Sequence, residues 1–418
     1  MVRKMNTKNK PMRSLYECFQ EQIDKLIDKK KIGNNTCCEK ILESDEKAKS
    51  FIQSITFSRV NIFDEYDEDL LLLNENYKNR TIHSVCVFLL GLTIGKFCDL
   101  FNKCEKVISD EEIQCLEPDR RIIKYRLWIL ASVLHDYGYF SKNIMNENLD
   151  TRSYLPYVLS DGCYCDCKLL RNYSMYHSGV LKLSYKEIEW YNDYARFYHK
   201  NDKFEKNDHG IIGGVEAFEK QAKSYKERFL NNEIPCRVYK KNILYYKTAC
   251  LTVCQHNIYK SKKETDEIYK KYKLDSLLSY AGYSVGIDTP LLALLSLVDT
   301  VECIKRVYKT EKCIEEFSVI DILKMIKICV HNDCIILDYD ALFHKMESSE
   351  MNNTKELEKL RTNIELLHDW TDFNVDHKND AKYCFSITLK TKPTITVVKS
   401  NNSAIGEIYQ TLDNKTPT

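Results

Sequence analysis

Four strongly apolar segments of helical length constrain the fold of this chain more than any other feature. Each segment carries a histidine or aspartate within it or directly after it. The segments are residues 81–101, 121–134, 243–256 and 291–308, with His83, His135, His256 and Asp299 as the polar exceptions. Burying an ionised aspartate without a partner costs several kcal/mol, and buried imidazoles need partners as well. The segments therefore predict packed helices that direct these side chains into one shared site.

The composition predicts a mainly α fold. Only 12 glycines and 7 prolines occur in 418 residues, which favours helices over sandwiches, propellers and glycine-rich nucleotide loops. We expect an N-terminal helical extension over residues 1–79 and a metal-binding helical domain over 80–310. A C-terminal helical region should follow over 311–418. Within the central domain, about 140–207 have a looser pattern that indicates an insertion or lid.

Several element boundaries can be predicted from local signals. Gly138 is expected to end the helix of residues 121–134, and the paired Gly213 and Gly214 should allow close approach of a neighbouring helix. In the C-terminal region, residues 317–330 and 355–367 have the pattern of amphipathic helices. Residues 384–389 and 394–398 alternate and are rich in Ile, Thr and Val, so they predict a small β-hairpin.

Charge, cysteines and apolar runs bound the partners and the compartment. The net charge of +1 gives no strong nucleic-acid footprint. The 18 cysteines are scattered, and no apolar stretch follows the basic N-terminus, so we expect reduced thiols and a cytoplasmic protein. The longest apolar runs fall short of the roughly 20 residues of a membrane span, so no membrane partner is expected. The oligomeric state stays open, a homo-oligomer included.

The dipeptide His135-Asp136 is informative because of the other histidines and aspartates that accompany it in the sequence. A second copy occurs at His368-Asp369, so the pair alone discriminates nothing. The first copy belongs to an ordered set that is suited to metal binding: His83, His135, Asp136, His209, His256 and Asp299. Imidazole and carboxylate ligands suit Fe, Mn, Zn, Co or Ni over Ca, and the absence of paired cysteines argues against a structural zinc site.

This ordered set resembles the HD-domain superfamily of metal-dependent phosphohydrolases, over roughly residues 80–308. The resemblance implies a helical core of about five helices. It further implies that His83, His135, Asp136 and Asp299 hold one metal, and that Asp136 bridges to a second metal held by His209 and His256. In that arrangement a bridging water attacks phosphorus in a nucleotide or related phosphate ester. The implied cofactor is two divalent metals, with identity open among Mn, Fe, Co, Ni and Mg.

Departures from the pattern argue against membership of the HD-GYP subfamily. After the His-Asp pair the chain continues Tyr137-Gly138-Tyr139, without the lysine of that subfamily, and its Gly-Tyr-Pro signature is missing after His256. Either Lys142 takes over that role from the next turn or the role is absent; Asp136 and Lys142 are the expected catalytic residues. The expected substrate-binding residues are Lys305, Arg306 and Tyr139.

Two other functions remain open. A diiron oxygenase acting on a small polyol or phosphonate would use the same scaffold, and a non-catalytic nucleotide-sensing module would carry a vestigial metal site. His177 and His199 compete with His209 for the second metal. The Cys-rich run 161–167 reads as a surface turn, the Lys-rich run 260–273 as a solvated helical face and the Tyr-rich segment 185–198 as packing.

Overall fold

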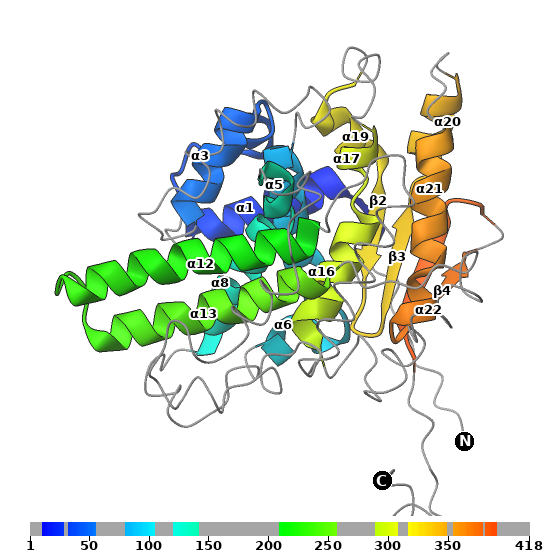
Figure 1. Cartoon of the computed structure of the whole chain (residues 1–418). Coiled ribbons are helices and arrows are strands. Elements are labelled where there is room, and N and C mark those ends of the chain that lie inside the picture. The colour runs from blue at the N-terminus through cyan, green and yellow to red at the C-terminus, as the bar shows by residue number, and fades with distance from the viewer. Residues whose placement is uncertain are drawn as a thin grey trace, which may run out of the picture.

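The computed structural model of the chain describes residues 11–28, 32–55, 80–104, 120–141, 209–256, 289–307, 317–348, 354–378 and 381–390. Of the described residues, 70% are helical and 11% lie in strands, which confirms the mainly α class. Figure 1 shows a helical body with a small sheet at one side of it. The long helices α12 (His209–Leu230) and α13 (Cys236–Gln255) run antiparallel along that body.

The helical body is built around one enclosed helix, α5 (Arg80–Ile94). Its neighbours are α1 (Leu15–Asp28), α3 (Asp45–Ile55), α8 (Arg120–Leu134), α16 (Pro290–Val301) and α17 (Ile304–Val307). Residues 81–91 of α5 are all buried, so this helix has no solvent-facing stripe. A helix that is apolar all round is stable only inside a protein, which explains why the sequence of α5 lacks amphipathic periodicity.

The predicted helix of residues 81–101 is interrupted. α5 ends at Ile94, and the chain continues as the short elements η2 (Phe97–Asp99) and α6 (Leu100–Lys103). The break is a backbone effect, because Cys98 and Asp99 have φ of 50° and 59°, outside the right-handed helical region. Apolar periodicity runs through the break and could not reveal it.

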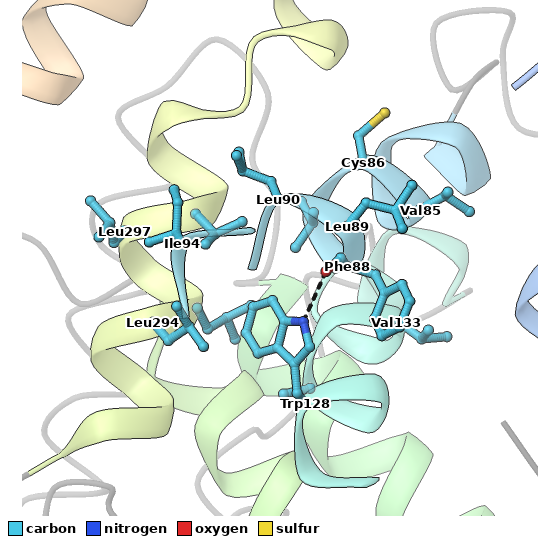
Figure 2. Close-up of a cluster of buried hydrophobic side chains, with 14 of the residues drawn as sticks. Val85, Cys86, Phe88, Leu89, Leu90, Ile94, Trp128, Val133, Leu294 and Leu297 are labelled. Atoms are coloured by element: carbon cyan, nitrogen blue, oxygen red, sulfur yellow. Dashed lines mark hydrogen bonds between the residues drawn. The ribbon is translucent and has the colours of Figure 1, made fainter. Parts of the chain in front are cut away.

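Trp128 of α8 fixes the contact between α8 and α5, as Figure 2 shows. Its indole Nε1 donates a hydrogen bond of 3.0 Å to the carbonyl oxygen of Phe88. The ring lies against Gly91, whose missing side chain leaves the room that the indole occupies. Leu294 and Leu297 of α16 belong to the same cluster (Figure 2).

Substituting Gly91→Ala is expected to destabilise the fold by about 1–3 kcal/mol, since the added Cβ would overlap the Trp128 ring in a filled core. The measurement is the free energy of unfolding in urea. Gly33→Ala is the matched control, because a Cβ at Gly33 meets nothing within 4 Å. Equal stability of the two variants would contradict the packing described here.

The antiparallel sheet brings residues 13–14 together with strands from the C-terminal region. Among the described residues it has five strands in the order β1-β2-β3-β5-β4. The strands are β1 (Arg13–Ser14), β2 (Lys327–Val330), β3 (Cys334–Asp338), β4 (Phe373–His377) and β5 (Cys384–Leu389). β1 pairs with β2 at Arg13 and Ile328, so residues directly before α1 form one edge. The remaining described helices are α2 (Cys38–Ile41), α19 (Val319–Met325), α20 (Asp340–Ser348), α21 (Thr354–Glu365) and α22 (Leu367–Trp370).

The C-terminal predictions were correct in part. Residues 355–367 form α21 and the start of α22, and 384–389 form β5 as expected. β5 pairs with β3 and β4, and the expected hairpin partner 394–398 lies outside the described residues. The predicted helix 317–330 is wrong beyond Met325, because Ile326 turns to extended backbone and β2 begins at Lys327.

Within the described ranges, no single helix has the length and hydropathy needed to cross a membrane. Thr81–Ile94 and Phe97–Lys103 together have the length and composition of a membrane span, but the two segments are bent by 101° relative to each other.

Candidate metal centre

Six ligand candidates that are far apart in the sequence meet in the interior of the helical body. His83 lies in the first turn of α5, and His135 and Asp136 directly follow the last residue of α8. The other three lie at or near helix ends: His209 is the first residue of α12 (His209–Leu230), His256 caps α13 (Cys236–Gln255), and Asp299 is in the last turn of α16. All six positions are ones that the sequence predicted.

Four of these residues form what we call site A: His83, His135, Asp136 and Asp299. The Nε2 atom of His83 lies 3.0 Å from Nε2 of His135, 3.5 Å from Oδ2 of Asp136 and 3.3 Å from Oδ1 of Asp299. Nε2 of His135 lies 3.5 Å from the same Asp299 oxygen. His83 and His135 are fully buried, and Asp299 is 17% exposed.

Asp136 belongs also to a second group, site B, with His209 and His256. Its Oδ1 atom lies 3.3 Å from Nε2 of His209, whereas its Oδ2 atom faces His83 of site A. The ligand atoms of Asp136, His209 and His256 lie within 4.8 Å of one another. One buried carboxylate therefore stands between the two groups, and its Oδ1 atom also lies 3.6 Å from Nε2 of His135 in site A.

The spacing of these atoms fits metal coordination. With bonds of about 2.1 Å, neighbouring ligands around a tetrahedral or octahedral ion lie about 3.0–3.4 Å apart. In site A the imidazole nitrogens and carboxylate oxygens lie 3.0 to 3.6 Å from one another in the pairs His83–His135, His83–Asp136, His83–Asp299, His135–Asp136 and His135–Asp299. His256 gives a second indication, because its buried Nε2 has no hydrogen-bond partner among the described residues. A buried ring nitrogen whose lone pair has no partner is costly, and a metal ion would satisfy it.

Three imidazoles are oriented by acceptors at their other ring nitrogen. Nδ1 of His83 lies 2.6 Å from Oε2 of Glu302, Nδ1 of His135 lies 2.7 Å from the Ser132 carbonyl, and Nδ1 of His256 lies 2.6 Å from the Val253 carbonyl. Because each acceptor requires the proton on Nδ1, each Nε2 is left to present its lone pair toward the carboxylates. Ligand histidines in metal sites are held in this way.

Charges around site A favour a bound cation. Burial raises the pKa of Asp299, but Lys305 and the imidazoles of His135 and His83 outweigh it and hold the pKa well below its usual range. Burial and Lys305 lower the pKa of His83, yet the carboxylates of Glu302 and Asp299 outweigh them, so the pKa lies above its ordinary value. Site A thus combines an ionised carboxylate, Asp299, with an imidazole, His83, whose surroundings favour a positive charge.

In site B the imidazole pKa is shifted in the opposite direction. Burial lowers the pKa of His256 from 6.5 to about 4, and the neighbouring His209 adds a smaller effect in the same direction. The folded protein keeps this ring neutral, whereas the unfolded chain protonates it near pH 6.5. The stability contributed by His256 is therefore complete above pH 6.5 and is lost as the pH falls toward 4. Between pH 7.5 and 5, metal-free wild type should lose about 2 kcal/mol more than a His256→Gln variant.

Urea unfolding of chelator-treated protein at the two pH values measures this difference. Comparison with His256→Gln removes the opposing contribution of His83, whose raised pKa adds stability as the pH falls. Parallel pH profiles of wild type and variant would contradict the buried neutral state of His256.

Glycines bring the segments of site B close enough to share an ion. Gly138, in η4 (Tyr137–Phe140), and Gly213 of α12 touch through their backbones. A Cβ at Gly138 would overlap the carbonyl oxygen of His209. Gly210 and Gly214 face α13 in the same way, and a Cβ at Gly210 would lie 3.0 Å from the His256 ring. The predicted close approach at Gly213 and Gly214 is confirmed, whereas Gly138 serves this approach and does not end α8, which stops at Leu134.

The predicted helix 291–308 is broken where it leaves site A. α16 ends at Val301, Glu302 is extended with φ −70° and ψ 125°, and α17 starts at Ile304. The hydroxyl of Tyr339 donates 2.7 Å to the Val301 carbonyl, which satisfies an acceptor that a continuing helix would have used. The break turns Glu302 toward His83 and returns Lys305 to Asp299, to which its amino group donates a hydrogen bond.

The remaining predicted residues fall in different places. Tyr139 stacks on the imidazole of His209 with ring centroids 4.0 Å apart, so it contacts a candidate ligand. Lys305, 24% exposed, contacts Asp299. Nε of Arg306 is buried and has no hydrogen-bond partner among the described residues. Lys142, the competitors His177 and His199, and the runs 161–167, 185–198 and 260–273 lie outside the described residues.

Sequence reasoning missed Glu302, the residue that holds His83. The available signal was its spacing, because Asp299 and Glu302 are three residues apart and share a face of any helix. Glu302, like Asp299, follows the mostly apolar run Leu291–Val298, so a buried partner is expected for its carboxylate as well.

Searches against protein-family models, curated proteins and solved structures found no match to this chain. The candidate metal centre therefore rests on the residues and geometry described above.

Proposed function

We propose that this chain is a metal-dependent phosphohydrolase of the HD type that hydrolyses a nucleotide or related phosphate ester. The observation that carries the proposal is the place of Asp136. Its carboxylate lies between the two groups of imidazoles: Oδ2 faces His83 of site A, and Oδ1 lies 3.3 Å from His209 of site B and 3.6 Å from His135 of site A. Such a shared carboxylate is the arrangement expected of two adjacent ions. The ordered ligand set and the helical scaffold are consistent with it.

Two divalent ions, when bound, would acidify a water molecule and neutralise charge on a phosphoryl group. The protein's own contribution is orientation and exclusion of water. Asp136 and the imidazoles of His83 and His135 are almost entirely buried, so the reacting groups would sit in a medium of low dielectric constant. Lys305 carries a partly exposed cation beside Asp299 and is suited to receive a phosphate oxygen at the edge of the centre.

The test begins with metal content by mass spectrometry, followed by turnover. Protein loaded with Mn²⁺, Co²⁺ or Fe²⁺ is assayed against linear and cyclic nucleotides and bis-p-nitrophenyl phosphate, with released phosphate or phosphomonoester as the readout. About two equivalents of metal and metal-dependent hydrolysis would support the proposal. Oxygen uptake by the iron-loaded protein would contradict the proposal and favour the diiron oxygenase instead. Nucleotide binding without turnover would replace it by the sensing module.

A further inference from the structure

Glu302 carries a carboxylate that is 3% exposed and lies just outside the metal ligands. Its Oε2 atom accepts a hydrogen bond of 2.6 Å from Nδ1 of His83. Its Oε1 atom accepts 2.7 Å from the backbone N–H of Ile304, and the N–H of Lys305 approaches Oε2 at 3.4 Å. A single buried carboxylate thus contacts a ligand of site A and the first turn of α17.

The contact with His83 fixes what that ring can do. A carboxylate only accepts hydrogen bonds, so the proton of His83 that faces Glu302 stays on Nδ1 and Nε2 points toward His135 and Asp299. The same contact fixes the plane of the ring. In metal sites such a carboxylate increases the basicity of the ligand histidine, and its loss typically weakens metal affinity by about 10- to 100-fold.

The contact with α17 acts on the other side of the site. The backbone N–H groups of Ile304 and Lys305 are held at the start of this short helix, and the side chain of Lys305 returns from there to Oδ1 of Asp299. That oxygen also faces His83 and His135. Glu302 therefore orients a ligand and, through the backbone, the cation that neighbours another ligand.

From these contacts we infer that Glu302 is a positioning residue for site A. It orients His83 as a ligand and holds the start of α17 so that the amino group of Lys305 stays beside Asp299. The inference rests on the proposed metal centre and adds to it a residue that governs one ion only. Among the described residues, Glu302 contacts His83 of site A, whereas the His256 ring of site B is held by the backbone carbonyl of Val253. The two ions should consequently respond differently to a change at position 302.

A competing explanation is that Glu302 merely caps α17. Two variants separate the explanations. Glu302→Gln keeps the shape of the side chain and one acceptor oxygen. Its neutral amide cannot accept hydrogen bonds from both His83 and the backbone N–H groups, as the two carboxylate oxygens do. Tyr339→Phe is the matched control, because it removes the hydroxyl that bonds to Val301 at the same helix break and touches no ligand.

The experiment is a titration of metal-free protein with Mn²⁺ or Co²⁺, by calorimetry and by competition with a chelator of known affinity. For Glu302→Gln we expect one of two binding steps to weaken by about 10- to 100-fold while the other is unchanged. Tyr339→Phe should keep both steps. In a His83→Gln background, the substitution at Glu302 should weaken metal affinity by less than it does in wild type, since only its contact with α17 remains. Circular dichroism verifies that each variant is folded.

Two results would overturn the inference, and they are distinguishable from failure of the metal centre itself. If Glu302→Gln binds both ions as wild type does, or weakens both steps to the extent that Tyr339→Phe does, Glu302 is a structural cap and the proposed function stands. If wild type binds neither ion, the proposed function fails first and the inference with it. Recovery of turnover by Glu302→Gln at saturating metal would further support positioning.

Discussion

Asp136→Asn is expected to empty both metal sites and to lower phosphoester hydrolysis by roughly 10³-fold. The substitution keeps the shape of the side chain but removes the charge that sites A and B share. Metal ions supply several kcal/mol of transition-state stabilisation in hydrolysis, and each 1.4 kcal/mol is about a tenfold change in rate. The measurements are metal content by mass spectrometry and initial rates under saturating metal.

The second His-Asp pair in the chain provides the control. Asp369 lies in α22, which packs on β4 and α21, and neither group of candidate ligands includes it. Asp369→Asn should therefore retain both ions and full activity. If Asp136→Asn still held about two equivalents of metal, Asp136 would not be the shared ligand and the dinuclear arrangement would have to be abandoned.

Gly138→Ala is expected to remove the ion of site B and leave that of site A, with a loss of about 3 kcal/mol in the free energy of unfolding. The added Cβ would overlap the carbonyl oxygen of His209, so α12 must move away from η4. That shift carries His209 away from Asp136, whereas site A draws no ligand from α12. Metal equivalents and urea unfolding are measured on the same samples.

Gly213→Ala tests the same contact from its opposite side. Its Cβ would overlap the backbone of Gly138, so it should reproduce the loss of one ion. Gly33→Ala should change neither metal content nor stability. Retention of both ions by the two interface variants would show that η4 and α12 can separate without disturbing His209, contrary to the geometry.

The candidate site could be predicted from the sequence because its residues conflict with their surroundings. His83 and Asp299 stand out in segments made otherwise of apolar side chains, and burial makes an unsatisfied polar group expensive. The residues that orient the ligands gave a weaker signal. Glu302 became visible only with the break at Val301, whose free carbonyl accepts a hydrogen bond from Tyr339, a residue 38 positions further along the chain. Such a tertiary hydrogen bond leaves no trace in local periodicity.

The helices were predictable where a long apolar period continued to a natural end, as in α8 and α13. The sheet was largely missed, because its strands are short and gain their stability from pairing. β1 has two residues, and its strand conformation depends on Ile328, more than 300 positions away. β2 follows a capped helix after one residue, so its apolar side chains read as a continuation of that helix.

The enclosure of α5 has a consequence for how this chain can change during evolution. Every residue from Thr81 to Gly91 is buried, with neighbours on all sides, and His83 alone among them is a candidate ligand. Substitutions that alter volume in such a helix create cavities or overlaps whichever way the side chain points. In descendants of this gene, α5 should therefore diverge more slowly than the outer faces of α12 and α21, although nearly all of its residues serve packing alone.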